Sequence, residues 1–126
     1  MSYQFFNPNP MSPYRGDCTV RALCKALDVD WHTAYFAICI EGAFPCDMPN
    51  SDSVWGSYLR SKGFERAIIP NTCPDCYTVA DFAADHPTGT YVLGTGTHAV
   101  TVQDGVIYDA FDSSNEIPIY YYTREG

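Results

Sequence analysis

The chain has 126 residues, of which 46% are hydrophobic and 17% charged, a balance typical of a folded domain and not of a disordered chain. Its formal net charge of −8 argues against nucleic acid and anionic membrane surfaces as partners, because both require a basic footprint. No apolar run approaches the length of a membrane span, and the N-terminal sequence MSYQFFNPNP lacks the pattern of a signal peptide, so we expect a cytoplasmic protein with a single domain over residues 1–126.

The first half of the chain has the spacing of helices. Residues 1–16 contain two Asn-Pro pairs, which predicts an extended, turning lead-in. Apolar residues then recur at helical spacing over about 17–27, 30–42, 53–62 and 78–86. The expected N-caps are Asp17, Asp30 and Thr78, with Asp81 completing a capping box, and the expected stops are Gly42 and Gly63.

The second half of the chain has the composition of strands. The segments TYVLG, HAVTV, VIYDAF and IPIYYYT are rich in branched and aromatic residues, and ERAII at 65–69 is a shorter candidate. The QDG between the second and third segments predicts a hairpin. The order predicts an α+β fold, with N-terminal helices packed on a C-terminal antiparallel sheet.

The stretch RGDCTV at 15–20 places Cys18 in the first turn of the first predicted helix. The dipole and the unpaired amides of a helix N-terminus lower the pKa of a cysteine and favour the nucleophilic thiolate. The alternative is a buried structural cysteine, since free cysteines are often buried.

A thiolate nucleophile needs a base, and histidine is the usual one. Of the three histidines, His98 opens the predicted strand HAVTV behind the flexible GTGT, where another element can reach it. The following hairpin arm, YDAFDSS, carries Asp109 and Asp112. Carboxylates on an otherwise apolar arm are costly unless they are paired, and one of them is expected to orient His98.

The order Cys18, His98 and then aspartate resembles that of papain-like cysteine peptidases, and the lead NPNPMSPYRGDCTVRAL is similar to small papain-like peptidases encoded by bacteria and phages. The resemblance implies a papain-like fold and a Cys-His-Asp triad that hydrolyses a peptide or isopeptide bond through an acyl-enzyme. It implies a protein or peptide substrate and no cofactor or metal. The alternatives are a non-catalytic papain-like scaffold that binds a protein partner and a peptidoglycan amidase related to the NlpC/P60 group.

The register of the late hairpin decides which aspartate meets His98. A two-residue Asp104-Gly105 turn puts Asp109 on the same face as His98, whereas a three-residue loop beginning at Gln103 puts Asp112 there. The resemblance favours Asp112, and Asp109 is the alternative.

The sequence departs from the papain pattern before the nucleophile, where relatives carry a glutamine that donates to the oxyanion. Position 12 is serine, and the side-chain amide of Asn9 is a possible substitute donor. The alternative is that the Asn-Pro pairs are turn residues only.

The motif CPDC places Cys73 and Cys76 in a predicted loop. Without an export signal we expect free thiols. We rank ordinary loop cysteines first, a redox pair second and a zinc site last, because a structural zinc site needs four ligands and no second pair is visible.

Overall fold

A computed structural model describes residues 3–11 and 16–124 of the chain. The described residues form four helices: α1 (Cys18–Leu27), α2 (Trp31–Ala43), α3 (Asp52–Ser61) and α4 (Val79–Asp85). They also form six strands: β1 (Tyr3–Phe5), β2 (Glu65–Ile68), β3 (Thr90–Gly94), β4 (Ala99–Gln103), β5 (Val106–Asp109) and β6 (Tyr120–Thr123). The predicted α+β class is therefore confirmed.

The strands form one sheet in the order β1-β5-β4-β3-β6-β2. Its central strands β5, β4, β3 and β6 pair antiparallel, as expected. The expectation of a purely antiparallel, C-terminal sheet is wrong at one edge, because β1 from the lead-in pairs parallel with β5. The added strand lets Tyr3 and Phe6 pack against the two cores, whereas Phe5 stays exposed, and the Asn-Pro pairs do not signal this tertiary contact.

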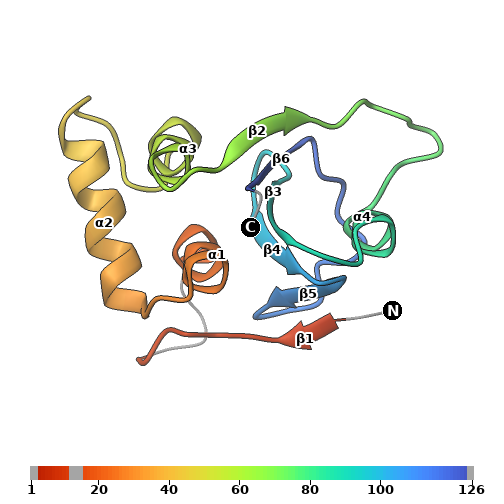
Figure 1. Cartoon of the computed structure of the whole chain (residues 1–126), viewed down its shortest axis with the longest axis horizontal. Coiled ribbons are helices and arrows are strands. Elements are labelled where there is room, and N and C mark those ends of the chain that lie inside the picture. The colour runs from red at the N-terminus through yellow and green to blue at the C-terminus, as the bar shows by residue number, and fades with distance from the viewer. Residues whose placement is uncertain (1–2, 12–15, 125–126) are drawn as a thin grey trace.

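Helices cover both faces of the sheet (Figure 1). One face packs against α1 and α3, with α2 packed against those two helices, and it contributes Val92, Tyr120 and Tyr122 to that core. The other face packs against α4 and contributes Leu93 and Val100 to a second core. The alternation of neighbouring side chains between two apolar layers explains why the strands read as nearly continuous hydrophobic runs.

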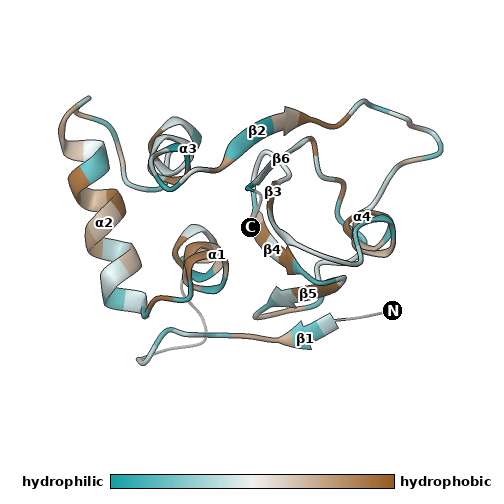
Figure 2. Cartoon of the chain, in the orientation of Figure 1, coloured by the Kyte–Doolittle hydropathy of each residue, from teal (hydrophilic) through white to brown (hydrophobic). Residues whose placement is uncertain are grey.

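Figure 2 shows hydrophobic residues on α1, on β4 and along much of α2. The α2 helix is apolar around most of its circumference, and Phe36, Ile40 and Phe44 remain exposed. Of the helices in the described part of the chain, none has the length and apolar character needed to cross a membrane.

Most predicted helix ends are confirmed. The Asp30 side chain accepts a hydrogen bond from the Thr33 backbone, and Thr78 with Asp81 forms the capping box at α4. Gly63 follows α3 with φ of +90°, a conformation that glycine adopts without strain. The prediction that Gly42 ends α2 is wrong. It lies inside the helix, where a Cβ atom would come within 2.7 Å of the Asp47 carbonyl oxygen.

The β4–β5 hairpin has the two-residue turn Asp104-Gly105. Gln103 pairs with Val106, and both turn residues have positive φ, 51° at Asp104 and 76° at Gly105. This register determines which carboxylate reaches the start of β4.

Candidate active site

Cys18 is the first residue of α1, and its half-buried thiol lines a cleft of about 190 Å³. The cleft lies where the start of α1 meets the loop between β3 and β4 and the start of α3. Its lining includes His98 and Ala99 from the β3–β4 side and Asn50, Asp52 and Trp55 from the α3 side. Three segments distant in sequence therefore surround the thiol.

His98 immediately precedes β4 and contacts Cys18. The imidazole Nε2 lies 2.7 Å from Oδ2 of Asp109, and the ring lines the same cleft as the Cys18 thiol and interacts with it electrostatically. Because Nε2 is engaged by Asp109, Nδ1 is the ring nitrogen left for the sulfur. The structure thus brings together the cysteine and the histidine that the sequence singled out. Another histidine, His86, stacks on Phe82 with 3.8 Å between ring centres.

The carboxylate beside His98 is Asp109, and the choice of Asp112 is corrected. The two-residue turn places Asp109 toward His98, as the alternative register required. Asp112 is exposed, and its Oδ1 accepts a hydrogen bond from the Ser114 backbone at 3.0 Å. It acts as a turn acceptor in the segment that follows β5.

Asp109 is only 3% exposed and is held by several donors. The Ser113 hydroxyl donates to Oδ2 at 2.7 Å, and the Ala110 amide donates to Oδ1 at 2.7 Å. An Arg21 Nη2 lies 3.6 Å from Oδ1. Burial raises the pKa of Asp109, but the hydrogen bonds from His98 and Ser113 and the charge of His98 outweigh it, so that this pKa lies below its ordinary value.

The same contacts shift the other two groups in opposite directions. Burial raises the pKa of Cys18, but the hydrogen bond with His98, another with the Ala99 backbone and the charges of His98 and Arg21 together lower it below the ordinary value. Burial lowers the pKa of His98, but hydrogen bonds to Asp109 and Cys18 raise it to about 10. Both shifts favour the thiolate–imidazolium pair, the reactive form of a cysteine nucleophile, over the neutral pair.

Asp17 holds the start of α1 in a way that the sequence did not predict. It stands at the N-cap position, but its side chain makes no cap hydrogen bond. The carboxylate is buried, pairs with Arg21, and accepts from Trp31 Nε1 at 2.9 Å. Arg21 thus lies between Asp17 and Asp109 and connects the start of α1 to the carboxylate behind His98.

Asn9, the expected oxyanion donor, belongs to this support. Its Nδ2 donates to Asp17 Oδ2 at 2.9 Å. It lines a separate pocket with Trp31 and His32, and the residues that line the Cys18 cleft do not include it. The structure therefore does not bring Asn9 to the place where an oxyanion would form beside Cys18.

Two other groups at the cleft can donate to an oxyanion. The backbone N–H of Cys18 lies in the first turn of α1, where amides have no intrahelical acceptor. The Asn50 side chain lines the cleft from the loop before α3. No local pattern in the sequence marks Asn50, because its position beside Cys18 depends on how α3 packs.

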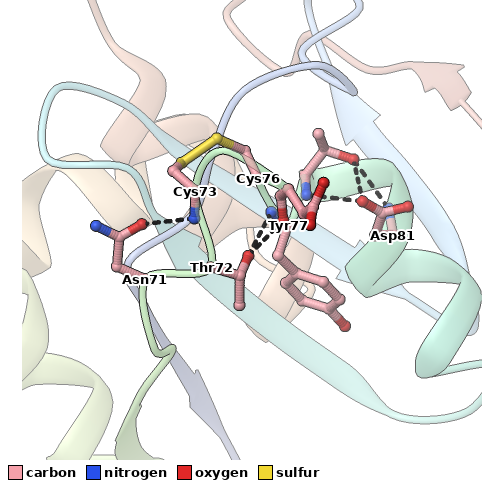
Figure 3. Close-up of a disulfide and its surroundings, with 8 residues drawn as sticks. Asn71, Thr72, Cys73, Cys76, Tyr77 and Asp81 are labelled. Atoms are coloured by element: carbon pink, nitrogen blue, oxygen red, sulfur yellow. Dashed lines mark hydrogen bonds between the residues drawn. A yellow bond between two sulfur atoms is a disulfide. The ribbon is translucent and has the colours of Figure 1, made fainter.

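Cys73 and Cys76 form a disulfide in the loop between β2 and α4, so the expectation of free thiols is wrong for this pair (Figure 3). Cys73 is exposed, and its backbone amide donates to Asn71 Oδ1 at 3.0 Å. The pair does not line the Cys18 cleft. Within residues 3–11 and 16–124, no group of three or more His, Cys, Asp or Glu side chains is placed to hold a metal ion.

The site therefore consists of a thiol beside an imidazole, and of a buried carboxylate that is hydrogen-bonded to that imidazole, at the wall of an open cleft. The order of contacts is Cys18 to His98 to Asp109. Such a series can activate a thiol for attack on a carbonyl carbon. Comparisons of the chain with models of protein families, with curated proteins and with solved structures find no match.

Proposed function

We propose that the protein is a papain-like cysteine peptidase or amidase that hydrolyses a peptide or isopeptide bond. The observation that carries this proposal is the contact series from Cys18 through His98 to Asp109 at a cleft. A papain-like hydrolase requires a helix that begins at the nucleophile, a strand that follows the histidine and a neighbouring strand that ends at the carboxylate. Here α1 begins at Cys18, β4 follows His98 and β5 ends at Asp109.

A non-catalytic scaffold is the less favoured reading, because a binding role needs none of these features. It would not require an imidazole beside the thiol or a buried carboxylate behind the ring. Burying Asp109 beside His98 and Arg21 carries a desolvation cost, which a purely structural core of apolar residues would avoid. A cluster of this kind at the wall of a cleft is typical of a functional site.

In the proposed reaction the Cys18 thiolate attacks the carbonyl carbon. A C–S bond forms, and the electron pair of the C=O double bond moves to oxygen. The resulting oxyanion accepts hydrogen bonds from the Cys18 backbone N–H and from Asn50. When the oxyanion collapses, the C–N bond breaks, and His98 transfers its Nδ1 proton to the leaving nitrogen.

The second half of the reaction restores the enzyme. Neutral His98 accepts a proton from water as the water oxygen attacks the thioester. The C–S bond then breaks, the acid product leaves, and the thiolate–imidazolium pair forms again. Asp109 keeps Nε2 of His98 as the donor to its carboxylate in both halves, so that Nδ1 remains the nitrogen that exchanges protons.

The test compares the wild-type protein with Cys18→Ala and with Cys39→Ala, a matched control for a half-buried cysteine on α2. Each is incubated with a peptide library, with isopeptide-linked peptides and with purified peptidoglycan, and the products are identified by mass spectrometry. We expect Cys18→Ala to abolish turnover while the circular dichroism spectrum is retained, and Cys39→Ala to remain active. Full turnover by a folded Cys18→Ala variant would overturn the proposal.

A further inference from the structure

The start of α3 brings a carboxylate into the same cleft as the reactive thiol. Asp52 is the first residue of α3, it is exposed, and it lines the cleft together with Cys18 and His98. The proposed hydrolytic steps do not use it. Asp52 is therefore a second anionic group, beside the Cys18 thiolate, that a bound molecule would meet in the cleft.

Two buried aromatic side chains hold the Asp52 carboxylate in place. The Tyr120 hydroxyl donates to Oδ2 at 2.9 Å, and Trp55 Nε1 donates to Oδ1 at 3.3 Å. Tyr120 is 4% exposed and Trp55 is 2% exposed, so these donors are themselves fixed by packing. A carboxylate has about four acceptor positions. Two of them therefore remain for a group in the cleft.

The charges at the cleft leave it negative. The Cys18 thiolate and the His98 imidazolium cancel, and Asp52 adds one negative charge. The ion pairs of the described residues do not include Asp52. A nearby arginine, Arg66, lies over Tyr120, the hydroxyl donor to Asp52, with its guanidinium 4.4 Å from the ring centre. This guanidinium forms no ion pair with the Asp52 carboxylate among the described residues.

We infer that Asp52 binds a cationic group of the substrate and so selects peptides with a positive charge beside the scissile bond. This inference rests on the proposed function and names its substrate class. Trp55 lines the same cleft but is almost completely buried, so it holds the carboxylate and leaves Asp52 as the group that meets the substrate. A lysine or arginine side chain and a free α-ammonium group are the two sources of this charge.

The first test measures the potential at Cys18 without needing turnover. The thiol is allowed to react with 2-aminoethyl methanethiosulfonate, a cation, and with methyl methanethiosulfonate, which is neutral. In each reaction the thiolate attacks sulfur, a mixed disulfide forms and methanesulfinate leaves. Peptide mapping by mass spectrometry gives the rate at Cys18 separately from the other thiols.

We expect Asp52→Asn to lower the ratio of cationic to neutral rates at Cys18 by about three- to tenfold, the size expected for unit charges several ångströms apart in a hydrated cleft. The asparagine keeps an acceptor for Tyr120. Asp28→Asn is the matched control, because it removes one charge at the exposed C-cap of α1 and should leave the ratio unchanged. Equal ratios in the wild-type protein and both variants would overturn the inference.

The second test uses peptide pairs that contain lysine or its neutral counterpart norleucine, each with a free or an acetylated N-terminus. A lysine preference that Asp52→Asn removes supports a side-chain cation, and a preference for the free terminus identifies the α-ammonium. Equal cleavage of all four peptides overturns the inference but leaves the proposed function standing. If Cys18 reacts with the neutral reagent no faster than exposed Cys46, the proposed function fails, while the rate ratio still reports on Asp52.

Discussion

Replacing Asp109 by asparagine tests the electrostatic basis of the site. The change preserves the size of the side chain and an oxygen acceptor, but it removes the negative charge that lies 2.7 Å from His98 Nε2. Without that charge the imidazolium loses its main partner, and the Cys18 thiolate then loses the cation that stabilises it. We expect the pKa of His98 to fall and the pKa of Cys18 to rise.

The size of this effect follows from the shift at His98. Its pKa of about 10, against an ordinary value of 6.5, corresponds to roughly 5 kcal/mol in favour of the imidazolium at 1.36 kcal/mol for each pKa unit. Asp109 and Cys18 both contribute to it through a hydrogen bond and a charge. If about half of this free energy belongs to Asp109, its loss lowers the pKa of His98 by roughly 1–2 units, and the pKa of Cys18 rises because the imidazolium beside it is less favoured.

The assay is the rate of Cys18 alkylation by iodoacetamide as a function of pH, followed by mass spectrometry of the peptide that contains Cys18. Because only the thiolate reacts, the rate reports the fraction of thiolate. In the wild-type protein we expect the rate to rise below pH 9.0, the ordinary pKa of a cysteine. In Asp109→Asn the rise should occur at higher pH.

Asp112→Asn is the matched control, since it removes the same charge from the segment just after β5, where the carboxylate faces solvent. Its alkylation profile should match that of the wild-type protein. A profile that is unchanged in Asp109→Asn, or a larger shift in Asp112→Asn, would refute the assignment of Asp109 as the partner of His98.

Three further predictions concern stability, measured by urea denaturation. Arg21→Met should lower the free energy of unfolding by about 3–5 kcal/mol, because it leaves two buried carboxylates without their shared cation; a loss below about 1 kcal/mol would contradict this. Gly94→Ala should cost about 1–3 kcal/mol, since a Cβ there overlaps the Tyr120 ring, whereas Gly16→Ala, with no atom within 4 Å of its Cβ, should be near neutral. The folded pKa of Asp109 lies below its unfolded value, so the unfolded chain binds more protons in acid and stability should fall as the pH drops below about 4; this decline should be shallower in Asp109→Asn.

Local signals in the sequence predicted the elements that local chemistry determines. The caps at Asp30 and Thr78 depend on a side chain and an amide three residues away, so the pattern alone is sufficient. The placement of Cys18 at a helix start and of His98 before a strand follows from the same kind of signal. Two of the three groups in the candidate site were therefore identified before any tertiary contact was known.

The third group depended on a contact that the sequence does not display. Two- and three-residue turns are both compatible with Gln-Asp-Gly, and they place different aspartates beside His98. In the structure, Gly89 selects the shorter turn, because its N–H donates to Asp104 Oδ1 at 3.0 Å and its carbonyl accepts from the Asp104 amide at 2.9 Å. Gly89 precedes β3, and only the folded sheet brings it to the hairpin.

The pairing of β1 with β5 makes the amino-terminal segment a neighbour of the reacting groups. Phe5 is in register with Asp109, the Phe6 amide donates to the Asp109 carbonyl at 2.8 Å, and the Tyr3 hydroxyl donates to the same carbonyl at 3.1 Å. A purification tag fused ahead of this strand, or a clone that starts a few codons late, would disturb the backbone that carries the carboxylate. Loss of thiol reactivity in such a preparation would then reflect the damaged strand and not the properties of Cys18 itself.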